Sequence, residues 1–215
     1  MSSVVRLLDV WQFDAWAPVE DIILPDGCRD LIYIETQGEA PKWFVSPFYD
    51  CAATVTTPHS TAMIGFRLRP GVDIDEQALL RELGGLDPHN ADVEDVLNSF
   101  VSIDAFTEDA LSGLAEIDAN SRSLVRRLGV SQRTLQRRLL LSTGKRPLYW
   151  MRLARVRRAA RLLNKEKSIS GLAHFCGYAD QSHLTREFQH WFGMTPKAFM
   201  AQPDLATSIN SVGYD

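Results

Sequence analysis

Apolar and polar positions follow a helical pattern most clearly near the end of the chain, over residues 168–199. Leu172 begins a short apolar stripe, Gly177 permits a turn, and Leu184 and Phe188 continue the stripe with the spacing of one helix face. Two short packed helices joined by a glycine turn are typical of a helix-turn-helix. The pattern therefore predicts such a motif here.

The same plan occurs earlier in the chain, with a turn one residue shorter. Its apolar and turn positions are Leu124, Val125, Leu128, Gly129, Leu135 and Leu139. Each copy is followed by a Gly-x-x-Pro, which begins at Gly144 in the first copy and at Gly193 in the second. One match is a weak signal, because any two short helices around a glycine produce it, but two matches in register indicate an internal repeat.

A long helix is expected between the two copies. Its apolar face consists of Tyr149, Leu153, Val156, Ala160 and Leu163. Its arginines are distributed over the other faces: Arg152, Arg155, Arg157, Arg158 and Arg161. Such a spacer would let two recognition helices enter successive major-groove segments, about 34 Å apart for a full turn of DNA.

The first 71 residues have a different pattern of short, β-leaning segments separated by PDG, QGEAP, SPFYD and TTPHS. In the last of them Ile64, Phe66 and Leu68 alternate with arginines, which gives that strand one buried face. A small antiparallel sheet or half-barrel is therefore expected. After Gly71 three helices with acidic outer faces follow, up to residue 120.

The predicted fold class is α+β. It comprises a small antiparallel β domain at 1–71, an acidic helical linker or dimerisation segment at 72–120, an all-α domain with two helix-turn-helix modules at 121–202, and a flexible tail at 203–215.

Charge is separated along the chain in a way that the overall value of −4 conceals. Residues 1–120 carry 6 Lys and Arg against 22 Asp and Glu, a net charge of −16, whereas residues 121–202 carry 17 against 3, a net charge of +14. A basic segment of this kind is typical of proteins that displace counterions from nucleic-acid phosphates. A merely solvated basic face would not need two recognition-helix patterns within it.

Polar side chains on the free face of each second helix are the candidates for DNA contact. They are Ser131, Gln132, Arg133, Gln136, Arg137 and Arg138 in the first copy, and Gln181, Ser182, His183, Thr185, Arg186 and Gln189 in the second. Ser131 is placed as an N-cap, Arg138 is expected to meet phosphate or solvent, and His183 is expected to be a surface or half-buried group that touches phosphate. Base reading is expected from Gln132, Arg133, Gln136 and Arg137, and from Gln181, Ser182, Thr185 and Arg186.

The stretch from about Ser123 to Phe199 resembles the DNA-binding domain of the AraC/XylS transcription regulators. The resemblance is carried by LGVSQRTLQRR, RLARVRRAARLL and FCGYADQSHLTREFQHWFGMTPKAF, and it departs from the common pattern at Leu139, where an aromatic residue is usual. It implies sequence-specific binding of double-stranded DNA, a contact with RNA polymerase if the protein is an activator, and no enzymatic activity.

The segments PDGCRDLIY and FRLRPG are similar to a small sensor-like domain that precedes some AraC-type DNA-binding domains. This resemblance implies control by an effector whose identity is unknown. In such proteins the following region connects the domains and often carries a homodimer contact. The side chains suited either to that contact or to core packing, with core packing favoured, are Leu79, Leu80, Leu83, Val93, Val96, Leu97 and Phe100.

Catalytic and metal-binding chemistry finds little support in the sequence. GxSxG, HExxH, P-loop and GxGxxG motifs are absent, and His59 and His89 are isolated, so neither a cofactor nor a metal is predicted. Cys28 and Cys51 are the candidates for a redox or signal site, or for thiol-dependent alkyl transfer, because Arg29 is placed to lower the pKa of Cys28. A small buried residue is the simpler interpretation of Cys28.

The sequence also bears on the location of the protein and on its partners. No apolar run is long enough to span a bilayer, and the first residues lack a basic and apolar leader, so a cytoplasmic protein without a membrane partner is expected. The alternative to DNA recognition is a protein-interaction module, in which the acidic N-terminal part binds a partner or inhibits the basic domain.

Overall fold

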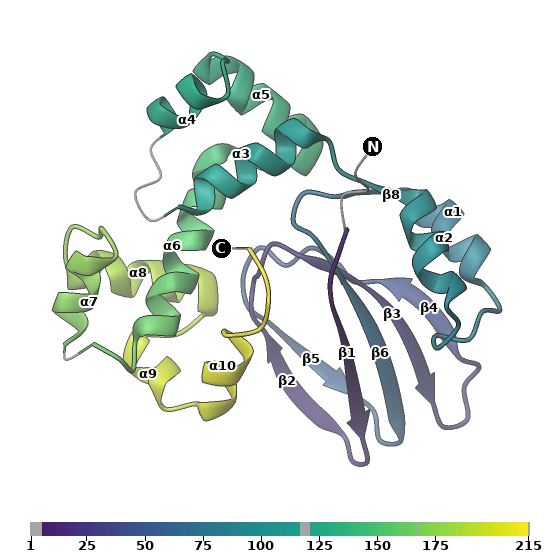
Figure 1. Cartoon of the computed structure of the whole chain (residues 1–215). Helices are drawn as coiled ribbons and strands as arrows, with labels where there is room; N and C mark the ends of the chain where they lie inside the picture. The colour runs from purple at the N-terminus through teal and green to yellow at the C-terminus, as the bar shows by residue number, and fades with distance from the viewer. Residues whose placement is uncertain (1–5, 117–120, 167, 215) are drawn as a thin grey trace.

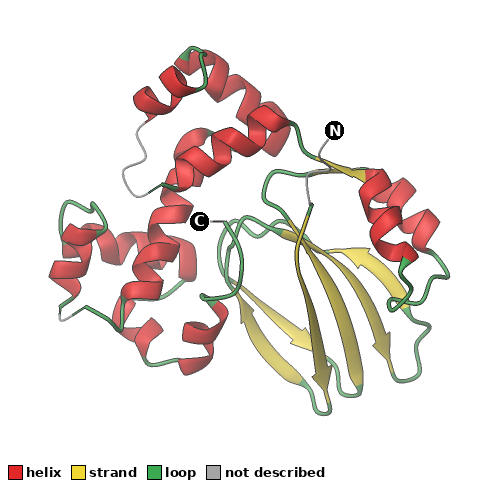
Figure 2. Cartoon of the chain, viewed as in Figure 1, coloured by secondary structure: helices red, strands yellow, loops and turns green. Residues whose placement is uncertain are grey.

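The structure is a computed structural model that describes residues 6–116, 121–166 and 168–214. Sheets form one side of the molecule and most of the helices form the other (Figures 1 and 2). The strands are β1 (Leu7–Ala15), β2 (Val19–Ile23), β3 (Arg29–Thr36), β4 (Lys42–Val45), β5 (Ala53–Thr57), β6 (Thr61–Leu68), β7 (Asp73–Ile74) and β8 (Val101–Ser102). The helices are α1 (Glu76–Leu83), α2 (Asp92–Phe100), α3 (Ala105–Ala115), α4 (Ser121–Arg127), α5 (Gln132–Thr143), α6 (Pro147–Leu162), α7 (Ile169–Phe175), α8 (Gln181–Phe192), α9 (Pro196–Met200) and α10 (Pro203–Ser208).

The N-terminal strands are antiparallel, as the sequence predicts. One sheet has the order β1-β6-β3-β4, and β2 pairs with β5 in a separate ladder. Leu31 and Phe66 pair at the centre of the sheet and are both buried. Gly65 lies opposite Trp11, and a Cβ atom on Gly65 would lie 2.0 Å from Cε2 of that indole. Trp11 lies flat over the glycine and donates its indole N–H to Asp30 at 2.9 Å.

Helices α1 and α2 cover one end of this sheet and complete the first hydrophobic core. Asp75 caps α1 by accepting the N–H of Ala78 at 3.1 Å. Within the apolar stripe considered for a homodimer contact, Leu79, Leu83, Val93 and Leu97 are buried, and Leu80, Val96 and Phe100 pack half-buried against the same core. The stripe serves core packing, and a homodimer contact through residues 72–120 stays a prediction.

Helix α3 belongs to the second, helical core, which corrects the predicted segment at 72–120. Its Ala110, Leu111 and Leu114 are buried in one cluster with Leu135 of α5 and Trp150 of α6. The segment is therefore divided between two cores: α1 and α2 pack on the sheet, whereas the apolar face of α3 packs on the helices that follow it. Figure 1 shows α3 beside α5 and α6.

The C-terminal tail is ordered and packed, so the predicted flexible tail at 203–215 is wrong over its described residues. Leu205, Ile209 and Tyr214 are 2%, 1% and 4% exposed and belong to the helical core. The hydroxyl of Tyr214 donates to the carbonyl of Leu111 at 2.9 Å, and its backbone N–H donates to the carbonyl of Asp26 at 2.7 Å. Three apolar side chains at helical and turn spacing give the tail enough area to bury. It thereby ties the sheet to the helices.

Two absences apply to the described residues. None of the helices formed by them has both the length and the apolar character that crossing a membrane requires. No three of their His, Cys, Asp or Glu side chains are grouped so as to hold a metal ion.

Candidate nucleic-acid interface

The two predicted modules have closely matching local geometry. Helices α5 and α8 each contain 12 residues, and equivalent positions lie 49 apart in the sequence, from 132 to 181. The side chain of Ser131 caps α5 by accepting a backbone N–H at 3.1 Å, and Asp180 caps α8 at 2.7 Å. The turn glycines Gly129 and Gly177 have φ values of +64° and +72°, which favour glycine. The predicted internal repeat is therefore present in three dimensions.

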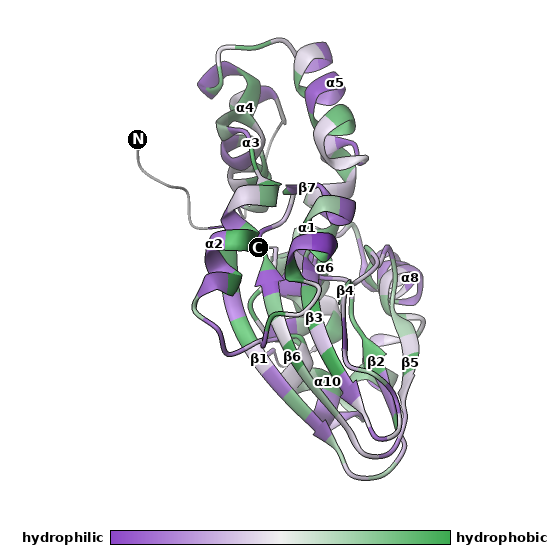
Figure 3. Cartoon of the chain, turned by 90° about the vertical axis from the view of Figure 1, so that its right-hand side faces the viewer, coloured by the Kyte–Doolittle hydropathy of each residue, from purple (hydrophilic) through white to green (hydrophobic). Residues whose placement is uncertain are grey.

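The inner face of each second helix is buried, and this leaves the predicted reading face outward. Leu135 and Leu139 of α5, like Leu184 and Phe188 of α8, are 0% exposed. The exposed candidates are Ser131, Gln132, Arg133, Gln136 and Arg137 in the first module, and Gln181, Ser182, Arg186 and Gln189 in the second. Figure 3 shows hydrophilic positions interleaved with hydrophobic ones along α5.

Two candidates of the second module are half-buried and have local partners. Thr185 donates its hydroxyl to the carbonyl of Gln181 at 2.9 Å. The ring of His183 lies edge-on to Tyr178 at 5.2 Å, and its Nδ1 is 3.5 Å from the backbone nitrogen of Ala179. The contacts of His183 lie at the turn between α7 and α8, whereas that of Thr185 lies within α8. A phosphate contact by His183 stays a prediction.

Arg138 differs from the other candidates, although it is also exposed. Its guanidinium donates to Asp104 at 3.0 Å and lies over the ring of Phe106, 3.7 Å from the centroid. Both partners belong to the beginning of α3. The structure thus places Arg138 on the side of α5 that faces α3, apart from the other candidates of that helix.

A buried carboxylate, which the sequence interpretation did not single out, fixes α8 to α6. Glu187 is 8% exposed, and Arg152 donates to its two oxygens at 2.7 and 3.1 Å while the indole of Trp191 donates at 3.3 Å. Burial raises the pKa of Glu187, but the hydrogen bonds and charge of Arg152 more than offset this and hold the pKa below its ordinary value. Glu187 could have been noticed as one of three acidic residues in 121–202.

The other arginines of α6 also have partners inside the protein. Arg157 is 1% exposed and donates to the carbonyl oxygens of Pro25 and Ser211, both at 3.2 Å. The remaining contacts join Arg158 to the carbonyl of Ala115, Arg161 to that of Ile209, and Arg155 to the ring of Tyr178. The expectation that these arginines cover outer faces is therefore wrong for Arg157. Much of the positive charge of α6 holds the fold together.

The thiol expected to be reactive is buried. Cys28 is 5% exposed, and burial, followed by the negative charge of Asp26, raises the pKa of its thiol well above the ordinary value. Arg29, which was expected to lower that pKa, instead pairs with Glu76 at 2.6 Å. A reactive thiolate at Cys28 is therefore contradicted, whereas Cys51 is exposed.

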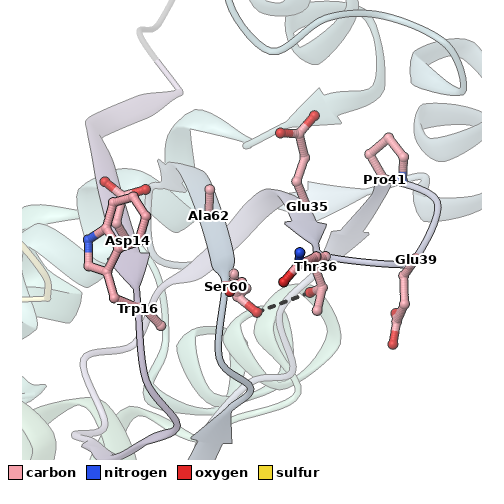
Figure 4. Close-up of a pocket in the computed structure, with 11 residues that line it drawn as sticks. Asp14, Trp16, Glu35, Thr36, Glu39, Pro41, Ser60 and Ala62 are labelled. Atoms are coloured by element: carbon pink, nitrogen blue, oxygen red, sulfur yellow. Dashed lines mark hydrogen bonds between the residues drawn. The ribbon is translucent and has the colours of Figure 1, made fainter.

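A cleft of about 420 Å³ opens at the hairpin end of the sheet (Figure 4). Its walls carry Asp14, Glu35 and Glu39, and Trp16 at its edge is 88% exposed. All of its lining residues lie between positions 14 and 62. The cleft therefore belongs to the acidic N-terminal half and is separate from the two reading helices.

Comparison with known proteins identifies the segment that contains these helices. A family model described as a helix-turn-helix domain matches residues 124–202. Residues 124–202 are an AraC-family helix-turn-helix domain. The AraC-type domain thus covers both modules and the helix between them. The family consists of transcription regulators and not of enzymes.

Curated relatives are similar to part of this chain. The chain is 48% identical over 71 residues to the HTH-type transcriptional regulator RipA of Corynebacterium glutamicum, which is 33% of this chain and 22% of RipA. It is 34% identical over 86 residues to the HTH-type transcriptional activator RhaS of Pectobacterium carotovorum, which is 40% of this chain and 31% of RhaS. The chain thus spans less than a third of the length of these two relatives.

Solved structures are similar to this chain as well. The DNA-binding domain of AdpA, in complex with a target DNA, is 33% identical, with a TM-score of 0.39, over 46% of this chain and 92% of that one. ToxT from Vibrio cholerae is 10% identical, with a TM-score of 0.47, over 94% of this chain and 97% of that one.

Proposed function

We propose that this chain is a sequence-specific, DNA-binding transcription regulator of AraC type. Helices α5 and α8 would each enter the major groove of double-stranded DNA, in successive segments on one side of the duplex. The N-terminal half would control this binding in response to an effector or partner of unknown identity. If the protein is an activator, it would also contact RNA polymerase.

The observation that carries the proposal is the matched pair of outward polar faces. Two capped helices of equal length bury equivalent leucine and phenylalanine positions and leave arginine, glutamine and serine side chains outward. These side chains can donate to or accept from base edges. The names of RipA and RhaS and the DNA-bound domain of AdpA support the same function.

Roles are assigned to the candidates by their position. Arg137 and Arg186 occupy equivalent, exposed positions and would each bind a guanine edge with two hydrogen bonds. Their neighbours for base reading are Gln132, Arg133 and Gln136 on α5, and Gln181, Ser182 and Thr185 on α8. Gln189 and His183 would lie nearer to phosphates.

The test is a pair of arginine substitutions on a site obtained by selection from random DNA. We expect Arg137→Ala and Arg186→Ala each to weaken binding by about 5–150-fold, corresponding to about 1–3 kcal/mol, and to relax specificity at one base pair. Fluorescence anisotropy measures both effects. Arg81→Ala, which removes an exposed arginine from α1, is the control and should leave affinity within a factor of two. Unchanged binding by both reading variants would overturn the assignment.

The alternative, in which the acidic half inhibits the basic domain, is favoured by ion pairs between the two halves. Lys145, at the beginning of the loop before α6, pairs with Asp50 at 2.6 Å. This contact lies away from the reading faces, whose arginines stay exposed. It therefore supports docking of the two halves but not direct covering of the DNA-reading residues.

A further inference from the structure

The same helical position anchors each reading helix, but to different parts of the protein. Arg138 of α5 and Glu187 of α8 are equivalent, since both lie three residues after a fully buried leucine of the repeat. Glu187 binds Arg152 of α6, within the helical domain. Arg138 binds Asp104, which precedes α3. Arg138 and Glu187 carry opposite charges at this equivalent position, and they therefore bind different partners.

The equivalent residues one turn further along α5 and α8 also have different partners. The indole of Trp191 on α8 donates to Glu187 of its own helix, and the backbone carbonyl of Trp191 accepts the N–H of Ala52 at 2.7 Å. The equivalent of Trp191 on α5 is Ser142, whose hydroxyl accepts from Thr107 of α3 at 3.0 Å. Two contacts of α5 therefore end on the first turn of α3.

Asp104 lies at the junction between the two hydrophobic cores. Three residues before it, Val101 of β8 is 1% exposed and belongs to the core formed by the sheet with α1 and α2. Six residues after it, Ala110 is 0% exposed and belongs to the helical core. Asp104 also caps α3 by accepting the N–H groups of Phe106 and Thr107 at 3.1 and 3.3 Å. A shift of the N-terminal core would therefore act on the start of α3 through this residue.

We infer that Arg138 is a positioning residue, which ties the first reading helix to the junction at Asp104, so that the N-terminal half controls DNA reading through α5. Helix α8 does not share this contact: Glu187 holds it on α6, and it meets the N-terminal half at Trp191, whose carbonyl accepts the N–H of Ala52 at 2.7 Å. This inference rests on the proposed function, because it describes how the same DNA-reading surface is regulated. It differs from a phosphate contact by Arg138, in which Asp104 would have no part.

The test separates the two roles by neutralising the carboxylate rather than the arginine. Asp104→Asn keeps a side chain that caps helices well but removes the charge that holds Arg138. Asp109→Asn is the matched control, since it removes the same charge from an exposed position on the same helix. Arg138→Gln and the double variant Asp104→Asn/Arg138→Gln complete a cycle. Each variant is made in the full chain. Fluorescence anisotropy measures its affinity for a DNA site obtained by selection, and for DNA sites in which the bases read by one of the two helices are altered.

We expect Asp104→Asn and Arg138→Gln each to lower discrimination at the half read by α5 by about 2–5-fold, the range for a half-exposed pair. Discrimination between bases in the half of the DNA site read by α8 should stay within error. The double variant should discriminate no less well than the poorer of the two single variants. Hydrogen exchange without DNA should become faster in α5 and not in α8 for Asp104→Asn.

Two other outcomes would contradict the positioning role of Arg138. If Arg138 meets phosphate, Arg138→Gln weakens binding to all sequences and reduces the salt slope by about 1, and Asp104→Asn behaves like Asp109→Asn. That result overturns the positioning role while the proposed function stands. If the unaltered chain shows no preference among DNA sequences, the proposed function fails and the inference fails with it.

Discussion

The anchor of the second reading helix can be tested by Glu187→Gln. Glutamine has nearly the same shape but is neutral and keeps one carbonyl acceptor, so it cannot accept both donors of Arg152 as a carboxylate does. Hydrogen bonds to charged groups contribute about 1.5–3 kcal/mol. The side chain of Arg152 is 37% exposed, and water can replace part of what is lost. We therefore expect a loss of about 1–2 kcal/mol at pH 7, at the low end of this range.

The pH dependence of this loss follows from the pKa of Glu187, which is lower in the folded protein than its ordinary value. Such a group contributes stability that is fully present above the unfolded pKa, about 4.3 for glutamate, and is lost as pH falls through the folded pKa. The difference between Glu187→Gln and the unaltered chain should therefore be constant from pH 7 to about pH 5 and shrink below about pH 4.

Urea unfolding, followed by tryptophan fluorescence and circular dichroism over this pH range, measures both effects. Glu166→Gln is the matched control, because it changes an exposed glutamate of the same domain and should stay within about 0.5 kcal/mol of the unaltered chain. A loss below 0.5 kcal/mol at pH 7, or one that does not change on acidification, would refute the reasoning.

Two further predictions concern the tail and the cysteines. Ile209→Ala should destabilise the helical core by about 2–4 kcal/mol in urea unfolding. Val212→Ala, at an exposed position of the same tail, should change stability by less than about 0.5 kcal/mol. Equally small effects of both substitutions would mean that the tail does not pack. In the native chain a thiol reagent should modify Cys51 rapidly, and Cys28 and Cys176 only after denaturant is added, because burial raises the pKa of both thiols. Mass spectrometry of the labelled peptides identifies the residues, and fast labelling of Cys28 would contradict its burial.

The sequence was most informative where a local rule determines the structure. Glycine at Gly177 and the cap at Asp180 specify a turn and a helix start without reference to distant residues, and the structure has both. The repeat then supplied a second, independent example of the same rule. This is why the two modules and the outward position of Arg137 and Arg186 could be predicted.

Contacts between distant segments could not be predicted in this way. The sequence predicts a flexible tail, because no local pattern shows that Tyr214 packs on Trp150, with ring centroids 4.8 Å apart, and against Gly27. Arg157 looked like an outer residue of a basic helix, yet its carbonyl partners come from Pro25 and from the tail. Both features depend on which surfaces meet, which periodicity does not encode.

The same contacts change what the charge of the basic segment means. A net charge of +14 over 121–202 suggests that many arginines meet phosphates. On α6, however, Arg152 is held by a carboxylate, and Arg157 and Arg158 by backbone carbonyls. Arginine suits both uses, since its planar guanidinium donates several hydrogen bonds in fixed directions. Net charge therefore locates the DNA-binding segment, but only burial and contacts distinguish the arginines that are free to read DNA, as we propose for Arg137 and Arg186, from those that hold the helices in place.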